Sequence, residues 1–474
     1  MSAIHLFLPQ RFFALLFSLI VATSASAQTQ HWFEALKASG DDRALYRVLH
    51  QMPKGGDLHN HTTGSVFVED WLDMALRDAA NGYTYFTKVR INNCRPFADA
   101  DPLYLMLFVN IPAFQHQTLS DCEQREYIAL ADMDDAQRDG WLNSLRLDQA
   151  GEGREAFFET HWQRLDGLLV SPHMRAEALF RNARGLAQEG ATYLETQLGL
   201  SGATTPDGNP ITPQAVLEIV KQRMQQADAE AMDITVRLQL MLLRFAPDAE
   251  DALRALYALA INNRDMIVGL NMAGREDNDK GHPRRFLEVL RELRHAAPLA
   301  LTIHAGEVDE PNDHVRDTLL IGASRIGHGI NLITDDELML DMRYGPYLVE
   351  INLISNLLLE YVVDYSQHPF PEYLRTGIPV ALSTDDRGMW DSTLTDEFFV
   401  AVKAFDLRWE EIVELGRNSL QYSFVQEPTK TELLDTFDRK IQRFARDMRR
   451  GRLANGDELP DTRIFICARY QICN

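Results

Sequence analysis

The feature that most constrains the fold is a series of eight short β-rich runs between residues 55 and 386. In chain order they are GGDLHNH, ATYLETQL, ITVRLQLMLL, MIVGLNMAG, LALTIHAGE, SRIGHG, YLVEINLIS and IPVALSTDD. Between them, residues 174–190, 213–230, 248–263 and 283–297 carry apolar side chains at helical spacing. Buried parallel strands that alternate with helices predict an α/β fold, a (β/α)8 TIM barrel.

One interval in this pattern is too long for a single crossover. It runs from Ser65 to Met174, after the first predicted strand, and predicts an insertion at about residues 80–127. Helical spacing over residues 28–51, ended by Met52-Pro53, predicts N-terminal helices before the barrel. We therefore expect the barrel over residues 52–450 and a C-terminal tail over residues 451–474.

The first residues have the pattern of an export signal. Arg11 precedes the apolar run FFALLFSLIV, and the small residues Ala25-Ser26-Ala27 follow it. The run is short for a membrane span, so a cleaved signal peptide over residues 1–27 is favoured over an uncleaved anchor. No later segment is apolar enough to be a membrane helix. The mature protein is then expected to be periplasmic or extracellular.

Export would place the four cysteines in an oxidising compartment. An even number permits two disulfides, and four cysteines allow three pairings. We favour Cys94 with Cys122 and Cys467 with Cys473. None of them lies near a histidine-rich motif, which disfavours a zinc–cysteine site.

The charge balance narrows the class of partner. The chain carries 69 Asp and Glu residues against 47 Lys and Arg residues, a formal net charge of −22. An acidic surface repels nucleic acid phosphates and anionic lipid. We therefore expect a small neutral molecule as partner, with no nucleic acid and no membrane span after signal cleavage.

Polar residues of unusual type fall where the predicted strands end. Catalytic groups of barrel enzymes come from the C-terminal ends of several strands. His59 and His61 are two residues apart, so in a strand both point to one side. With His304 and Asp385 they supply three imidazoles and a carboxylate, which suits zinc with room for a water. The lysine that could bridge two metals is absent from MIVGLNMAG, so one ion is expected.

The other polar residues at this rim each have a structural alternative. His59 and His61 could be polar residues at a loop edge, Asp385-Asp386 could be a turn after a strand, and His328 could be a satisfied buried histidine. Glu307 could cap the following helix. Their coincidence at one rim favours a catalytic site, in which partial burial raises the pKa of Glu307 and makes it a proton donor.

These stretches make the chain similar to the adenosine deaminase family, and most similar to its secreted branch, the adenosine deaminase-related growth factors. The matching motifs, in the family's order from Met52 to Asp386, are MPKGGDLHNHTTG, GLNMAGRED, TIHAGE, SRIGHGINL, EINLISN and LSTDD. The resemblance covers the whole barrel. It implies hydrolytic deamination of adenosine or 2′-deoxyadenosine at C6, which gives inosine and ammonia.

The resemblance also implies a role for each site residue. One zinc ion would be held by His59, His61, His304 and Asp385. Glu307 would protonate N1, and His328 with Asp385 would orient the zinc-bound water. The implied substrate contacts are the backbone of Gly274, the side chain of Asp386 on the N7 side as a hydrogen-bond acceptor, and His61. The secreted branch further implies a disulfide in the insertion and a possible homodimer.

Three departures from the family pattern bear on the substrate. Asn271 stands where the family usually has an aspartate, Arg387 replaces a common proline, and Thr62-Thr63 follow His61. Arg387 could shift the loop or bring a cation near the pocket. Two alternatives therefore stay open: a deaminase of another 6-aminopurine nucleoside, and a secreted binding or signalling protein that uses the insertion as its working surface.

Overall fold

The computed structural model describes residues 31–96, 102–149, 151–277, 279–453 and 458–474. The predicted signal peptide at residues 1–27 lies outside these ranges. Within them, no helix is long and apolar enough to cross a membrane.

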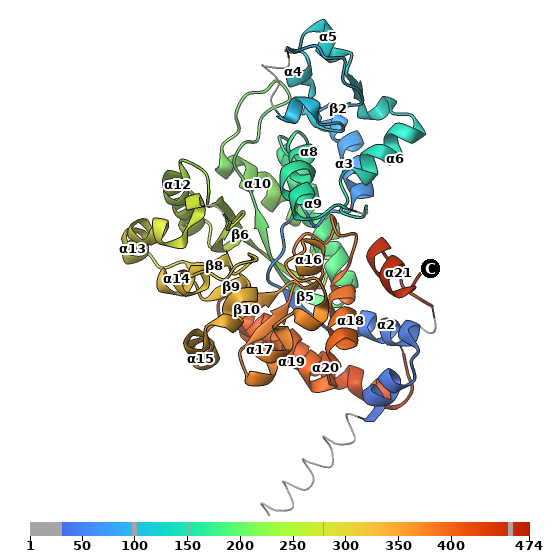
Figure 1. The fold of residues 1–474 in the computed structure, drawn as a ribbon, viewed down its shortest axis with the longest axis vertical. Helices are drawn as coiled ribbons and strands as arrows, with labels where there is room; N and C mark the ends of the chain where they lie inside the picture. The colour runs from blue at the N-terminus through green and yellow to red at the C-terminus, as the bar shows by residue number, and fades with distance from the viewer. Residues whose placement is uncertain (1–30, 97–101, 150, 278, 454–457) are drawn as a thin grey trace, which may run out of the picture.

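Eight parallel strands form the centre of the molecule, and each predicted run contains one of them (Figure 1). They are β1 Gly55–Asp57, β5 Ala191–Leu198, β6 Thr235–Leu243, β7 Ile267–Ala273, β8 Ala300–Ala305, β9 Arg325–His328, β10 Leu348–Ile351 and β11 Val380–Leu382. Their order in the sheet is the order of the chain. The predicted (β/α)8 barrel is confirmed.

The seam between the last strand and the first lies at the rim. Asn60 and Asp385 form a parallel bridge just beyond the ends of β1 and β11. Asp385 N donates to His59 O at 2.9 Å, and His61 N donates to Asp385 O at 3.1 Å. The barrel is therefore closed by the two segments that carry three of the four predicted metal ligands.

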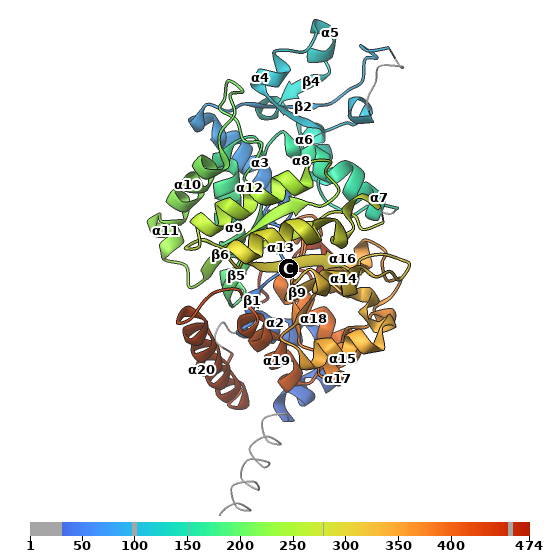
Figure 2. The same ribbon diagram turned by 90° about the vertical axis from the view of Figure 1, so that its left-hand side faces the viewer.

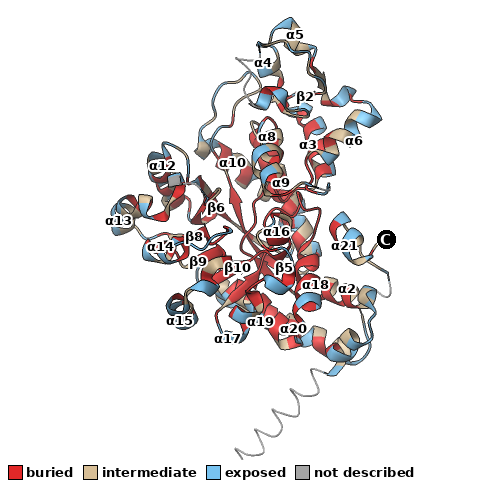
Figure 3. Ribbon diagram, viewed as in Figure 1, coloured by how far each residue is buried: buried red, intermediate tan, exposed pale blue. Residues whose placement is uncertain are grey.

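Helices surround the strands, with buried inner faces and exposed outer faces (Figures 2 and 3). They are α9 Pro172–Gln188, α10 Pro213–Met224, α11 Ala227–Glu230, α12 Ala249–Asn262, α13 Leu287–Ala296, α14 His314–Leu320, α15 Asp336–Tyr344, α16 Leu353–Leu358, α17 Phe370–Thr376, α18 Leu394–Phe405, α19 Trp409–Gln421 and α20 Thr429–Arg449. The single helix expected over residues 213–230 is two helices. Residues 283–286, expected to be helical, form a 3-10 turn before α13.

The first part of the interval after β1 forms a small sheet with short helices, drawn at the top of Figure 1, and its later part packs against the barrel. After α3 (Val68–Arg77), strands β2 (Tyr85–Lys88), β3 (Asn110–Pro112) and β4 (Tyr127–Ala129) form an antiparallel sheet in the order β3-β2-β4. This sheet extends just past the predicted boundary at residue 127. The rest of the interval holds α4 (Ala113–His116), α5 (Asp121–Gln124), α6 (Asp135–Asn143), α7 (Arg154–Ala156), η5 (Phe157–His161) and α8 (Trp162–Asp166).

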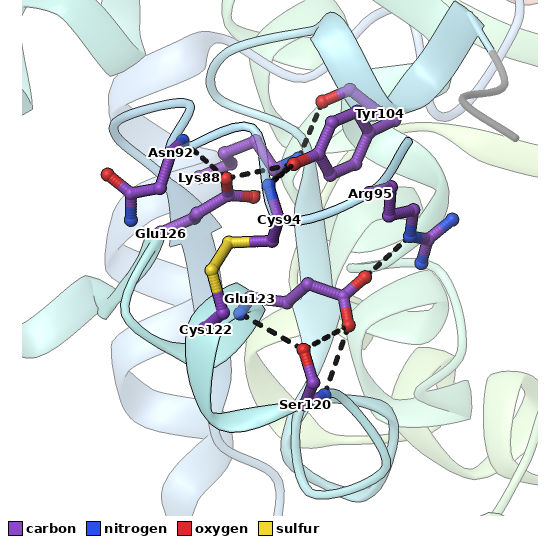
Figure 4. The surroundings of a disulfide bond; sticks show 9 residues. All are labelled: Lys88, Asn92, Cys94, Arg95, Tyr104, Ser120, Cys122, Glu123 and Glu126. Carbon is purple, nitrogen blue, oxygen red and sulfur yellow. Dashed lines mark hydrogen bonds and ion pairs between the residues drawn. A yellow bond between two sulfur atoms is a disulfide. The ribbon is translucent and has the colours of Figure 1, made fainter. Parts of the chain in front are cut away.

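The favoured disulfide pairing is confirmed, since Cys94 is joined to Cys122 and Cys467 to Cys473. The first bond ties the segment after β2 to α5, beside an ion pair of Lys88 Nζ with Glu126 Oε2 at 3.2 Å (Figure 4). The second closes the end of α21 (Ile464–Tyr470).

Both ends of the described chain pack on the same side of the barrel. A helix over residues 31–38 and α2 (Asp42–Gln51) precede β1. In Figure 1, α21 lies beside α2 and α18. Arg43 Nη1 donates to Cys473 O at 2.7 Å, so the C-terminal tail is fixed to the N-terminal helices.

Candidate active site

Four side chains converge at the seam of the barrel. His304 Nε2 lies 3.0 Å from His59 Nε2 and 3.2 Å from His61 Nε2. Asp385 Oδ1 lies 3.5 Å from His59 Nε2 and 3.2 Å from His61 Nε2. All four residues are buried, and among the described residues they form a group that could hold a metal ion. The structure therefore brings the whole predicted ligand set together.

The backbone around these residues differs from the strand that the sequence predicts for His59 and His61. β1 ends at Asp57, so His59 and His61 lie beyond the strand rather than within it. Asp385 has a φ of 53°, in the left-handed region, so the backbone at Asp385-Asp386 does not continue the extended strand. The prediction that these residues converge is confirmed, whereas its reason, strand alternation, is wrong. The hydrogen bonds across the seam hold the histidines in place instead.

A second set of residues fixes which imidazole nitrogens face the centre. His59 Nδ1 lies 2.8 Å from Glu350 Oε2, and His304 Nδ1 lies 3.1 Å from Asn271 Oδ1. A histidine that gives its Nδ1 proton to such a partner keeps the Nε2 lone pair for a metal. Asn271 is thus a partner of His304. Its side chain is not among those that line the cavity.

The donor set fits one metal ion. Two ligand atoms that bind the same ion at about 2.0–2.2 Å cannot lie more than about 4.4 Å apart, and the distances found here are 3.0–3.5 Å. The electrostatics also favour a cation at this point. Burial lowers the pKa of His59, but hydrogen bonds to Asp385 and Glu350 outweigh it and raise that pKa to about 10. The cluster favours a positive charge, and a metal ion supplies one.

A cavity of about 520 Å³ opens beside the cluster, within the range of about 300–1,000 Å³ common for small-molecule sites. Its polar lining includes His61, Gly274, Glu307, His328, Asp385 and Asp386. One wall is aromatic and comes from the long interval after β1, through Phe157, Phe158 and Trp162. All the predicted catalytic and substrate-binding residues therefore border one cavity.

Glu307 is held by its neighbours and is buried. The carboxylate of Glu276 accepts hydrogen bonds from Gly306 N and Glu307 N, both at 3.0 Å, which fixes the turn after β8. Burial raises the pKa of the Glu307 carboxyl well above its usual range, and the nearby charge of Asp385 raises it further. Glu307 does not cap α14, which begins at His314. It is a buried acid in the cavity wall that keeps its proton more readily than an exposed glutamate.

Asp386 packs against the loop that carries the first two histidines. A Cβ at Gly64 would lie 1.7 Å from Asp386 Oδ1, so a side chain there would displace this carboxyl. Burial and the adjacent charge of Asp385 raise the pKa of Asp386 well above its usual range. A carboxyl that keeps its proton more readily in this way can donate a hydrogen bond, whereas the role expected from the resemblance is that of an acceptor.

Arg387 is not among the residues that line the cavity, so the second of the two effects suggested for it, a cation near the pocket, is not found. Its Nη2 pairs with Glu189 Oε1 at 2.9 Å, at the end of α9, and its guanidinium lies 5.1 Å from the ring of Phe67. Of the other departures, Thr63 lines the cavity, whereas Thr62 Oγ1 contacts Thr196 Oγ1 at 2.7 Å.

Sequence reasoning missed three groups of residues. Glu350 is an isolated acid in the apolar run YLVEINLIS, and such an interruption could have marked it. Glu276 stands in the quoted motif GLNMAGRED but was given no role. The aromatic wall of Phe157, Phe158 and Trp162 carries no recognisable pattern and lies far along the chain from the other site residues.

Known proteins resemble this chain in sequence. The family model for adenosine deaminase matches residues 117–440. An adenine deaminase of Chelativorans sp. (strain BNC1) is 30% identical over 58% of this chain and 85% of its own length. An N6-methyl-AMP deaminase-L of Xenopus laevis is 28% identical over 52% and 70%. An adenosine deaminase of Enterococcus faecalis is 29% identical over 52% and 71%.

Solved structures share the fold. An amidohydrolase of Burkhoderia ambifaria with bound zinc gives a TM-score of 0.62 at 18% identity, covering 86% of this chain and 94% of that one. An Arabidopsis ADAL in complex with IMP gives 0.60 at 21% identity, covering 84% and 99%. The match to the family model begins after His59 and His61, so the assignment of these two residues as candidate metal ligands rests on the geometry of the site alone. Because that match spans more than half of the chain, the protein belongs to the adenosine deaminase family.

Proposed function

We propose that the protein is a zinc-dependent hydrolytic deaminase of adenosine or 2′-deoxyadenosine. The observation that carries the proposal is the juxtaposition of four candidate metal ligands with the buried carboxyl of Glu307, whose pKa is raised, in the wall of one cavity. Hydrolysis at C6 of a purine needs an activated water and a proton donor for the ring nitrogen, and the cavity offers a group for each.

His59, His61, His304 and Asp385 would hold the ion. When bound, zinc lowers the pKa of a coordinated water to about 7 and so supplies a nucleophile near neutral pH. Asp385 and His328 orient the water. Glu307 gives its proton to N1, which lets the ring accept electrons at C6.

The purine is held by two further groups. Asp386 donates a hydrogen bond to N7, which carries a lone pair, and the backbone of Gly274 contacts the base. The φ of 104° at Gly274 brings this backbone to the cavity wall, where a Cβ would lie 2.5 Å from the ring of Phe245. The aromatic wall excludes water from the reacting face.

The cavity supports a nucleoside over a nucleotide. A 5′-phosphate needs a cation with free donors. Among the described lining residues the arginine is Arg175, two of whose five N–H donors are taken by backbone oxygens, Leu169 O at 2.7 Å and Gly199 O at 2.8 Å, which leaves fewer for a phosphate. Asp166, which also lines the cavity, adds a negative charge there. The acidic net charge of the chain also disfavours the binding of a negatively charged phosphate group.

We also propose that the protein is exported. The pattern of residues 1–27 motivates this proposal, and the two disulfides support it because such bonds persist in oxidising compartments. Expression of the full chain in a bacterial host, with fractionation and N-terminal sequencing, would test it. A mature N-terminus at Gln28 is expected, whereas an uncleaved chain in the cytoplasm would contradict it.

A substrate panel tests the proposed activity. Purified zinc-loaded protein would be assayed with adenosine, 2′-deoxyadenosine, adenine, AMP and N6-methyl-AMP. Highest kcat/KM on the two nucleosides is expected. Preference for N6-methyl-AMP or adenine, the substrates named for two relatives, would keep the chemistry and overturn the assignment to nucleosides.

A further inference from the structure

His328 has one ring nitrogen engaged and one free. Its Nδ1 lies 2.9 Å from Asn356 Nδ2 and 3.3 Å from Asn352 Nδ2, and both amide nitrogens are donors. Nδ1 is therefore an acceptor. Glu307 Oε1, 3.6 Å from Nδ1, is too far for a hydrogen bond. Nε2 is buried and has no hydrogen-bond partner among the described residues, in a side chain that lines the cavity.

The direction of the hydrogen bond from Asn356 to His328 follows from the contacts that His368 makes with Phe370 and with Asn356. Phe370 N lies 3.1 Å from His368 Nδ1, and a backbone N–H can only donate. His368 must then carry its proton on Nε2, because burial lowers its pKa to about 3 and keeps the ring neutral. Nε2 donates to Asn356 Oδ1 at 3.0 Å. The amide of Asn356 therefore turns its NH₂ group toward His328.

The elements that carry this chain are fixed in place. His368, Asn356 and His328 are all buried. Asn356 lies on α16. The first two backbone N–H groups of this helix, at Leu353 and Ile354, donate to the two carboxylate oxygens of Glu397 on α18, each at 3.1 Å. The position of Asn356 beside His328 is therefore fixed by α16, and the direction of its amide is fixed by His368; we call the contacts from His368 through Asn356 to His328 the relay.

We propose that Asn356 and His368 are positioning residues that hold His328 as its neutral Nε2–H tautomer. His328 then presents a hydrogen-bond donor to the cavity rather than a base. In a hydrolytic deamination such a donor orients the attacking oxygen and stabilises the negative charge that this oxygen carries as hydroxide before it attacks. The kinetic part of this inference rests on the proposed deaminase function, whereas the tautomer does not.

Nitrogen NMR of the zinc-loaded enzyme, labelled with ¹⁵N-histidine, reads the tautomer directly. The signals of His328 would be assigned by their loss in His328→Gln. We expect a protonated Nε2 and an unprotonated Nδ1. A protonated Nδ1, on a neutral or a doubly protonated ring, would overturn the proposal without any variant of the relay having to fold.

Two matched variants test the relay itself. His368→Leu removes the donor that orients Asn356, whereas the amide of His368→Gln can still donate to Asn356 Oδ1. We expect His368→Leu to lose the Nε2–H signature of His328 and to lower kcat about 10- to 100-fold, with zinc content and KM retained. His368→Gln should keep the Nε2–H signature of His328 and the kcat close to their wild-type values.

Asn356→Leu should reproduce the loss seen with His368→Leu. An unchanged His328 signal and unchanged kcat in the zinc-loaded His368→Leu enzyme would overturn the proposal. Wild-type enzyme that turns over no 6-aminopurine would overturn the proposed function alone. The NMR signals of His328 in wild type and His368→Leu would still test whether Asn356 and His368 set its tautomer.

Discussion

Replacing Glu307 with Gln separates proton donation from metal binding. The carboxyl is buried, its pKa is raised by burial and by Asp385, and it lies outside the four-residue metal cluster. Gln has nearly the same volume and is neutral, as the protonated acid is, so the fold should keep its stability. Its amide can form a hydrogen bond but cannot transfer a proton to N1.

The expected loss follows from the role. General acid catalysis contributes about 10²–10⁴-fold in rate, or about 2.7–5.4 kcal/mol of transition-state stabilisation. Because Glu307 is only 6% exposed, solvent cannot easily replace its proton, so we expect Glu307→Gln to lose about 10³-fold or more in kcat. Zinc content should be unchanged.

The assay measures kcat and KM on adenosine together with elemental zinc and the melting temperature. Glu310→Gln is the matched control, because Glu310 is exposed on the same loop. A folded, zinc-loaded Glu307→Gln enzyme with the wild-type kcat would refute the reasoning.

Four further outcomes are expected. His304→Ala should lose zinc and activity together, and zinc retained by this variant would contradict the ligand set. Burial raises the pKa of Asp396 to about 7, above an unfolded value of about 3.9, so the native state keeps a proton that the unfolded chain releases and stability falls as pH rises between the two. Asp396→Asn should therefore gain in melting temperature relative to wild type as the pH rises from about 4 to about 7, and a constant difference would contradict the shift. Arg387→Ala should lower the free energy of unfolding by about 3–5 kcal/mol, because it breaks a buried ion pair. It should leave the ranking of substrates by kcat/KM unchanged, and an altered ranking would indicate that Arg387 acts on the pocket. Cys94→Ser with Cys122→Ser should lower stability by about 2–4 kcal/mol and keep kcat, and lost turnover in the folded variant would make the insertion part of the site.

The barrel could be predicted because its strands are buried on both faces. In β5 every residue is buried, so the run ATYLETQL stands out from its neighbours. The ligands could be predicted because they occupy the ends of such runs. The path that brings His59 and Asp385 together could not be predicted, since it depends on hydrogen bonds across the seam between residues more than 300 positions apart.

The cavity wall and the supporting contacts follow from tertiary packing. Trp162 reaches the cavity from a segment with no periodic signal, and its ring lies 6.2 Å from that of His61. The replacement of a proline by Arg387 suggested a shifted loop or a cation near the pocket, but the turn after β11 directs the side chain toward Glu189. Neighbours in sequence diverge at a turn, and only the structure shows which way each side chain points.

The most direct test is turnover of adenosine to inosine and ammonia by the mature protein, measured before and after a chelator, with elemental analysis of the metal. The account predicts one zinc per chain, activity that is lost with the metal and activity that zinc restores. Turnover that persists in metal-free protein, or zinc-loaded protein that deaminates no 6-aminopurine, would contradict it.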